Sequence, residues 1–108
     1  GRVLLIGDAA HVTNTRGGMN MNCGLHDAWT LGQTFTGIHD PLTLGGLLDS
    51  WAHARRAIVT DELIPRTDRL VGGGAMYFAA VEASARQEGM ARDYVRDAAM
   101  MDIAPSFA

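Results

Sequence analysis

The sequence has 108 residues, of which 47% are hydrophobic, and its formal net charge is -3. This length suits one small domain, and the apolar fraction is typical of a globular chain. The basic residues are scattered without a stripe, which argues against nucleic acid as a partner. No apolar run approaches the roughly 20 residues of a membrane span, and we recognise no signal peptide. The single cysteine excludes an internal disulfide and favours a cytoplasmic location.

The first predicted element is a strand. Residues 3–6 form a continuous apolar run that ends at Gly7-Asp8, which is typical of a strand buried in a parallel sheet. A polar loop with two glycines follows over residues 13–18, and apolar residues at helical spacing occupy 25–35. In open α/β sheets, ligands bind beyond the carboxyl ends of the strands, where such a loop lies.

The chemistry of this strand-loop-helix unit favours an electron-rich ligand. The first turn of a helix leaves about four N–H groups unpaired and carries roughly half a positive charge. Gly17 and Gly18 have no side chain to hold a planar ligand away from the backbone. Asp8 is an acceptor suited to sugar or polyol hydroxyls. The residues alone leave an alternative open, in which Asp8 caps the turn and the glycines only make it tight.

Two motifs carry a resemblance to a known family. The segments GDAAH at 7–11 and GGMNMNCGLHDA at 17–28 resemble the second flavin motif of the p-hydroxybenzoate hydroxylase-like FAD monooxygenases. A weaker likeness at 51–56, WAHARR, is similar to the family's Tyr-x-x-Glu-Arg-Arg-Pro. The resemblance spans about two thirds of the chain. Beyond residues 7–11, the matching positions are Gly17, Gly18, Asn22, Gly24, Asp27 and Ala28.

The sequence departs from the family pattern at two places. Asn14 and Thr15 stand where the family often has prolines, so we expect a less rigid loop on the substrate side. Asn20 replaces a usual glycine, and we expect it to adopt the backbone angle of that glycine, which asparagine tolerates better than most residues.

The resemblance implies an α/β parent fold, Rossmann-like, that binds FAD and takes NADH or NADPH as co-substrate. It implies hydroxylation of a small aromatic, phenol-like substrate with oxygen. Asp8 would bind the ribityl chain, and the amides near Met21 and Asn22 would face the flavin N1–C2=O edge. No catalytic acid or base is assigned. The implied cofactor-binding residues are Gly7, Asp8, Gly17, Gly18, Met21 and Asn22, and the implied substrate-side residues are Thr13, Asn14 and Thr15.

The chain is also expected to be a piece of a longer enzyme. It starts inside the predicted strand, and the family needs a G-x-G-x-x-G turn for the ADP half of FAD. The only candidate, residues 72–77, has Tyr77 at the last glycine position and no preceding strand. We therefore expect 1–108 to be the C-terminal part of an FAD-binding monooxygenase domain, with a flavin motif at 1–37 and a helical segment at 38–108. Its partner would be the missing N-terminal FAD-binding portion, and self-association as a homo-oligomer stays open.

Beyond the strand, four or five helices are expected, so this chain itself is mainly α. The first would run from near Asn22 to Phe35, with Asn20 or Asn22 as N-cap, and end around Gly37. The second would start at Asp40-Pro41, with one apolar face through Ile58. Pro65 would kink or end it. Later helices are expected at 75–87 and 91–101, separated at Gly89.

Side-chain placement within these helices follows from their spacing. Arg55 is expected to lie along an apolar face with its charged head in water. In the last helix, Tyr94, Val95, Ala98 and Met101 are expected to point inward.

Other residues suggest weaker hypotheses. Cys23 is expected in the first turn of a helix, with His26 three residues further on, which suggests the hypothesis that Cys23 is a nucleophile activated by His26. The preferred interpretation is that Cys23 is a small buried residue. His11 is expected to pack or hydrogen-bond, and Arg55-Arg56 to form surface or interdomain salt bridges. The four histidines are too dispersed to favour a metal site.

Two other functions stay open at this level. One is a non-enzymatic helical interaction module, and the other is a related flavin-dependent oxidase or halogenase. Flavin binding would distinguish a hydroxylase from the helical interaction module. Halide dependence would distinguish a halogenase from a hydroxylase.

Overall fold

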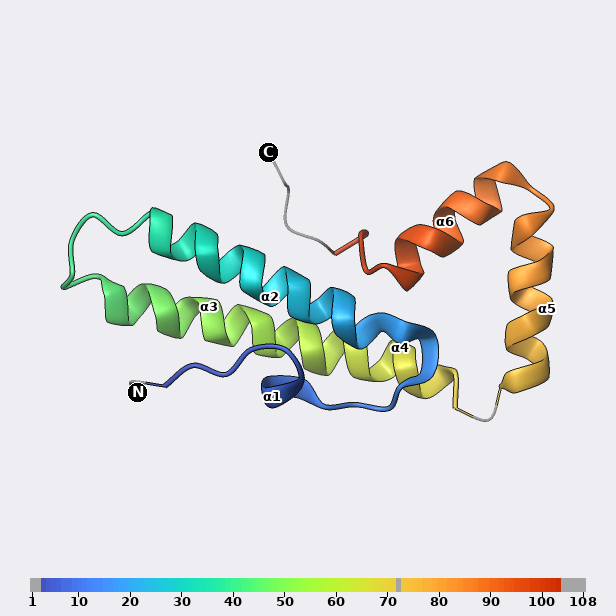
Figure 1. Cartoon of the computed structure of the whole chain (residues 1–108), viewed down its shortest axis with the longest axis horizontal. Helices are drawn as coiled ribbons and strands as arrows, with labels where there is room; N and C mark the ends of the chain where they lie inside the picture. The colour runs from blue at the N-terminus through green and yellow to red at the C-terminus, as the bar shows by residue number, and fades with distance from the viewer. Residues whose placement is uncertain (1–2, 72, 104–108) are drawn as a thin grey trace.

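The computed structural model describes residues 3–71 and 73–103. Two long helices lie side by side, and a pair of shorter helices forms an arm at one end (Figure 1). The Cα radius of gyration is 16.3 Å and the extents are 52 × 29 × 17 Å. A compact domain of this length has a radius near 13 Å. The described chain is therefore elongated and thin.

The prediction of a strand at residues 3–6 is wrong for the described part of the chain. These residues are extended but belong to no β-ladder, and the described ranges contain no strand to pair with them. A strand exists through hydrogen bonds to a neighbour, so an apolar run alone does not make one. Val3 and Leu5 are exposed. After Gly7, at φ 58° and ψ -145°, one helical turn forms α1, Asp8–His11.

The first long helix confirms the main helical prediction. α2 spans Met19–Thr36 and ends at the C-cap Gly37, as expected, but it begins three residues early. A short 3-10 turn, η1 (Arg16–Gly18), leads into it. The N-cap is Gly18 rather than an asparagine. Asn20 lies inside α2 and does not have a positive φ, so this position makes no demand for a left-handed backbone.

The second long helix is continuous through three segments. α3 (Leu44–Ile58) passes into a π-helical segment, η2 (Val59–Leu63), and then into α4 (Ile64–Arg69). Pro65 has no N–H to donate, and the wide π turn directly before it accommodates this loss. Asp40 is not the N-cap. Its Oδ1 accepts the Leu42 N–H at 2.9 Å, which closes a turn before α3.

The arm consists of α5 (Gly74–Ala85) and α6 (Glu88–Ala98), which pack against each other (Figure 1). The break falls at Arg86-Gln87, before Gly89. The inward face predicted for α6 is partly wrong. Val95 is 61% exposed and Met101 is exposed, whereas Met100 is fully buried. The chain turns through Met100 at φ 56°, and this left-handed residue redirects the side chains that follow the helix.

The small core lies where the start of α2, η2, α4 and the turn after α6 meet. No helix in the described residues is both long enough and apolar enough to cross a bilayer. Large apolar side chains remain exposed on several elements, and such surfaces mark interaction sites. The core comprises Met19, Cys23, Leu63 and Met100, with Ile58, Val59, Leu70 and Ile103 packed around them.

Candidate functional site

A cavity of about 510 Å³ lies between α1, the following loop and the start of α2. Five of the nine predicted site residues line it. Gly7, Asn14, Gly17 and Asn22 do not line it. The lining of this motif cavity is Asp8, Val12, Thr13, Thr15, Gly18, Asn20, Met21 and Gly24.

Asp8 offers this cavity a carboxylate with no competing partner. It is the first residue of α1 and is exposed. Its carboxylate makes no hydrogen bond or ion pair with any other residue of the described chain. The interpretation of Asp8 as a side-chain cap is therefore not supported, and its oxygens are free to accept ligand hydroxyls.

The N-terminus of α2 opens on the same cavity. Gly18, the N-cap, has φ 66° and provides no side-chain cap for the first-turn amides. Gly17 has φ 80°, and a Cβ there would lie 2.6 Å from Leu70 Cδ1, so this glycine also serves packing on the far side of the loop. A Cβ at Gly18 would meet nothing within 4 Å. An uncapped 18-residue helix leaves donors and a positive dipole end for an electron-rich ligand.

A buried ion-pair network holds the GDAAH segment against both long helices. Asp27, on α2, is 2% exposed. Its Oδ2 accepts the Gly7 N–H at 2.9 Å and lies 2.6 Å from His11 Nε2. Its Oδ1 accepts Arg55 Nε–H at 2.6 Å. Burial alone would raise the pKa of Asp27, but the hydrogen bonds from Gly7, His11 and Arg55, with the Arg55 charge, hold it below the usual value.

This network corrects one expectation and confirms another. Arg55 is 6% exposed and its guanidinium is buried, so its head does not lie in water. The Arg55 guanidinium is buried because the buried carboxylate of Asp27 requires a charge partner. His11 hydrogen-bonds as expected. Its Nε2 lies against Asp27 Oδ2, and its buried Nδ1 has no hydrogen-bond partner among the described residues.

The depressed pKa of Asp27 predicts a pH dependence of stability. A carboxyl whose folded pKa lies below the ordinary 3.8 stabilises the fold above that value. This stabilisation is lost as the pH falls through the folded pKa. Below about pH 4, we expect the free energy of unfolding to decrease with falling pH less steeply in Asp27→Asn than in the wild type. Urea unfolding at several pH values measures this difference, and parallel slopes would contradict it.

Close packing of two glycines completes the junction between the GDAAH segment and α2. A Cβ on Gly24 would lie 3.2 Å from Gly7 Cα, which is tighter than ordinary contact. Glycine at position 24 therefore allows the backbone of Gly7 to come close enough to donate to Asp27, and glycine at position 7 suits the φ of 58° there.

The cysteine nucleophile hypothesis is wrong for this geometry. Cys23 is fully buried, and burial raises the pKa of its thiol despite the opposing charge of Arg55. Burial and the nearby Arg55 also lower the pKa of His26. A thiol with a raised pKa and no solvent access is a poor nucleophile. Cys23 is a small core residue, as the preferred interpretation had it.

The same network brings together three metal-binding residue types that sequence spacing did not connect. Ligand atoms of His11, Cys23 and Asp27 all lie within 4.8 Å of one another. Arg55 already donates to Asp27 Oδ1, and its Nη2 donates to Cys23 Sγ at 3.4 Å. The Arg55 guanidinium thus already supplies a positive charge to two of the three groups, so the geometry favours an ion-pair network.

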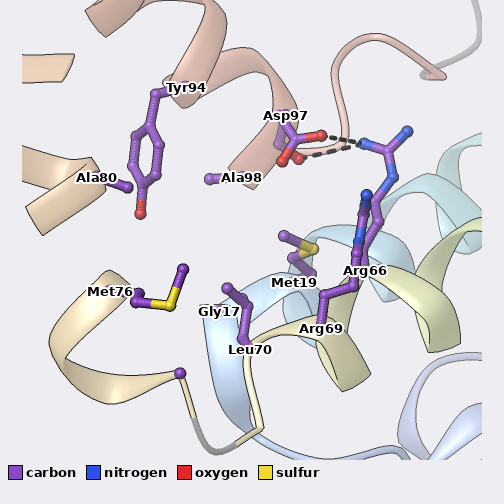
Figure 2. Close-up of a pocket in the computed structure, with 11 residues that line it drawn as sticks. Gly17, Met19, Arg66, Arg69, Leu70, Met76, Ala80, Tyr94, Asp97 and Ala98 are labelled. Carbon is purple, nitrogen blue, oxygen red and sulfur yellow. Dashed lines mark hydrogen bonds and ion pairs between the residues drawn. The ribbon is translucent and has the colours of Figure 1, made fainter. Parts of the chain in front are cut away.

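A second cavity, of about 350 Å³, lies on the other side of the Gly17 turn, between α4, α5 and α6 (Figure 2). Arg66, 7% exposed, closes one end of it. Its guanidinium donates to Asp97 at 3.0 Å, to Asp102 at 2.6 Å and to Glu62 at 2.9 Å. The hydrogen bond from Arg66 lowers the pKa of Asp102. Arg66 therefore ties α6 and the turn after it to α4.

Comparison with known proteins agrees with the motif. Residues 1–64, more than half of the chain, match the FAD binding domain family. The chain belongs to this family. In this FAD binding domain protein the match covers α1, the loop, α2, α3 and all of η2. No solved structure matches the chain.

Several curated relatives of this FAD binding domain protein are monooxygenases. It is 41% identical over 66 residues to rifampicin monooxygenase of Streptomyces venezuelae, covering 61% of the chain and 14% of that protein. It is 42% identical over 67 residues to 6-hydroxy-3-succinoylpyridine 3-monooxygenase of Pseudomonas putida, covering 61% and 17%. It is 37% identical over 67 residues to pentachlorophenol 4-monooxygenase of Sphingobium chlorophenolicum, covering 62% and 12%. The matches thus span under a fifth of each relative.

Sequence reasoning missed the Asp27–Arg55–His11 network. A signal for it was present, because His11 and Asp27 lie in the matched motif and Arg55 in the weaker match at 51–56. An aspartate on the buried side of a helix requires a partner, and that requirement points to a cation on the neighbouring helix.

Proposed function

We propose that this chain is the C-terminal part of an FAD-dependent monooxygenase that hydroxylates a small aromatic, phenol-like substrate. The parent fold would be α/β and Rossmann-like, with residues 1–37 as the flavin motif and 38–108 as the helical segment. Family membership and the names of the relatives support this proposal. The observation that carries it is the motif cavity, which is lined both by Asp8, whose carboxylate has no partner among the described residues, and by the uncapped N-terminus of α2.

The residues of the cavity fit a flavin. Asp8 would accept hydrogen bonds from the ribityl hydroxyls. The free first-turn amides of α2, which end at Met21, would stabilise the electron-rich N1–C2=O edge, for the same reason that helix N-termini bind anions. Asn22 is the fourth residue of α2, so its amide belongs to the intrahelical hydrogen bonds and the role expected for it passes to the preceding residues. Gly18 would allow close approach of the ring, because it lines the cavity and a Cβ there would meet nothing within 4 Å. Gly17 would act indirectly, by permitting the tight turn that packs against Leu70.

The substrate side would be formed by Thr13, Asn14 and Thr15. When bound, FAD supplies the redox chemistry that activates oxygen, with electrons from NADH or NADPH. This chain's part is to bind and orient the ring and to stabilise charge at its edge. The exposed apolar side chains, such as Val3 and Leu5, would be covered by the N-terminal FAD-binding portion of the enzyme or by a second copy. A cytoplasmic location is part of the proposal, supported by the lone reduced cysteine.

Purification of the intact protein tests this function. We expect a yellow protein that releases FAD on denaturation and oxidises NADH or NADPH faster when a phenol is added. A colourless protein that does not quench the fluorescence of added FAD would contradict the proposal and favour a helical interaction module. Dependence of turnover on halide would instead favour a halogenase.

Asp8→Ala is expected to raise the FAD dissociation constant of the intact protein by about tenfold or more. Hydrogen bonds to a charged group contribute about 1.5–3 kcal/mol, and 1.4 kcal/mol is a factor of ten. Quenching of FAD fluorescence during titration of the apoprotein measures this constant. Asp49→Ala, which removes an exposed carboxylate on α3, is the matched control and should bind as the wild type does. Equal affinity in Asp8→Ala would remove Asp8 from the site.

A further inference from the structure

The loop that follows α1 is held to α2 by one side chain. Asn20, in the first turn of α2, uses both ends of its amide. Its Oδ1 accepts the Thr13 hydroxyl at 2.5 Å, and its Nδ2 donates to the Asn14 carbonyl at 3.1 Å. Asn20 and Thr13 both line the motif cavity and are half-buried. The Asn20 amide thus holds two successive loop residues at the edge of the cavity.

A second contact holds the same loop from the opposite side. Asn14 Nδ2 donates to Asp68 Oδ1 on α4 at 2.8 Å. Asn14 Oδ1 accepts the Arg16 N–H at 3.0 Å, which closes a turn of the loop on itself. This contact is exposed, whereas the Asn20 contacts are partly buried. The partly buried contacts restrain the loop more strongly, because water competes less for them.

These hydrogen bonds restrain the loop that was expected to be less rigid. The expectation rested on the absence of proline at positions 14 and 15. Proline restrains a chain covalently by fixing φ, whereas the Asn20 amide restrains it by hydrogen bonds to neighbouring residues. The two departures from the family pattern are thus physically connected, because the asparagine at 20 reaches the loop that lacks proline.

We propose that Asn20 is a positioning residue that holds the loop 13–16 over the flavin in the motif cavity and so slows release of the flavin. This role rests on the proposed function. Asn20 acts through the loop, since both of its hydrogen bonds go to Thr13 and Asn14. A loop released from α2 would gain conformational freedom and expose the cavity.

The geometry of Thr15 allows a rescue experiment. Its backbone lies at φ -83° and ψ 2°, near the φ of about -65° that proline imposes. No hydrogen bond uses the Thr15 N–H in the described part of the chain. Asn14, the residue that would precede the proline, lies outside every helix, so a proline at 15 would interrupt no helical turn there. Thr15→Pro is therefore expected to stiffen the loop without Asn20.

The test compares Asn20→Gly with the double variant Asn20→Gly/Thr15→Pro in the FAD-loaded intact protein. We expect Asn20→Gly to raise both the amide hydrogen exchange of residues 13–16 and the FAD dissociation rate by about tenfold. The double variant should return both rates toward wild type. Gln33→Gly, an exposed glycine substitution in α2, controls for helix propensity and should change neither rate.

The outcomes separate this role from the proposed function. If the wild type binds FAD but Asn20→Gly leaves either rate unchanged, the positioning role is wrong and the flavin site stands. If Asn20→Gly releases FAD faster and Thr15→Pro does not reverse this, the positioning role is also wrong. The effect of Asn20 would then not act through the stiffness of the loop. A wild type that binds no FAD would overturn the proposed function and this role together.

Discussion

Arg55→Met is expected to lower the free energy of unfolding by about 3–5 kcal/mol, because it leaves the buried Asp27 carboxylate without its cation. Arg55 and Asp27 are 6% and 2% exposed, so water cannot replace the lost charge partner. Methionine fills a similar volume, which keeps a cavity from adding to the loss. Urea unfolding of the protein followed by circular dichroism measures the change.

Two further variants show whether the loss comes from the ion pair. Arg56→Met changes the exposed neighbour on α3 and should cost under about 0.5 kcal/mol. The double variant Asp27→Asn/Arg55→Met removes both charges and should be more stable than Arg55→Met alone. Equal losses at Arg55 and Arg56 would show that the network contributes little.

Gly18→Glu is expected to raise the FAD dissociation constant by about 100-fold, which corresponds to about 2.8 kcal/mol. The backbone there has φ 66°, which costs a non-glycine residue about 1–3 kcal/mol. A Cβ at this position meets no atom within 4 Å, so the new carboxylate would extend into open space at the start of α2. There it would compete for the first-turn amides and repel the electron-rich flavin edge.

Gly18→Asn is the matched control for Gly18→Glu. Asparagine tolerates the left-handed conformation and adds no charge, so most of the FAD affinity should remain. FAD titration of both apoproteins, with circular dichroism to confirm equal helicity, separates strain from charge. Tight FAD binding by Gly18→Glu would place the flavin away from the N-terminus of α2.

The sequence predicted the long helices well because their signals are local. Apolar spacing and Gly37 located α2 and its end, and Pro65 marked an interruption that the structure resolves as a π segment. The start of α2 was predicted less well, because the left-handed backbone at Gly18 replaced the expected asparagine cap. Of the eight residues that line the motif cavity, five were named as site residues from the sequence, whereas Val12, Asn20 and Gly24 were not.

The residues by themselves determined the helical segments, the family and the segment that forms the motif cavity, because each depends on neighbours close in the chain. Tertiary structure alone decided where charged and polar side chains pair. Asp27 and Arg55 are 28 positions apart, and Asn14 and Asp68 are 54 apart. Such pairs form only after helices pack, since spacing along the chain does not encode which faces meet. No strand forms at 3–6 in the described residues for the same reason, because β-structure needs a second segment that hydrophobic spacing cannot supply.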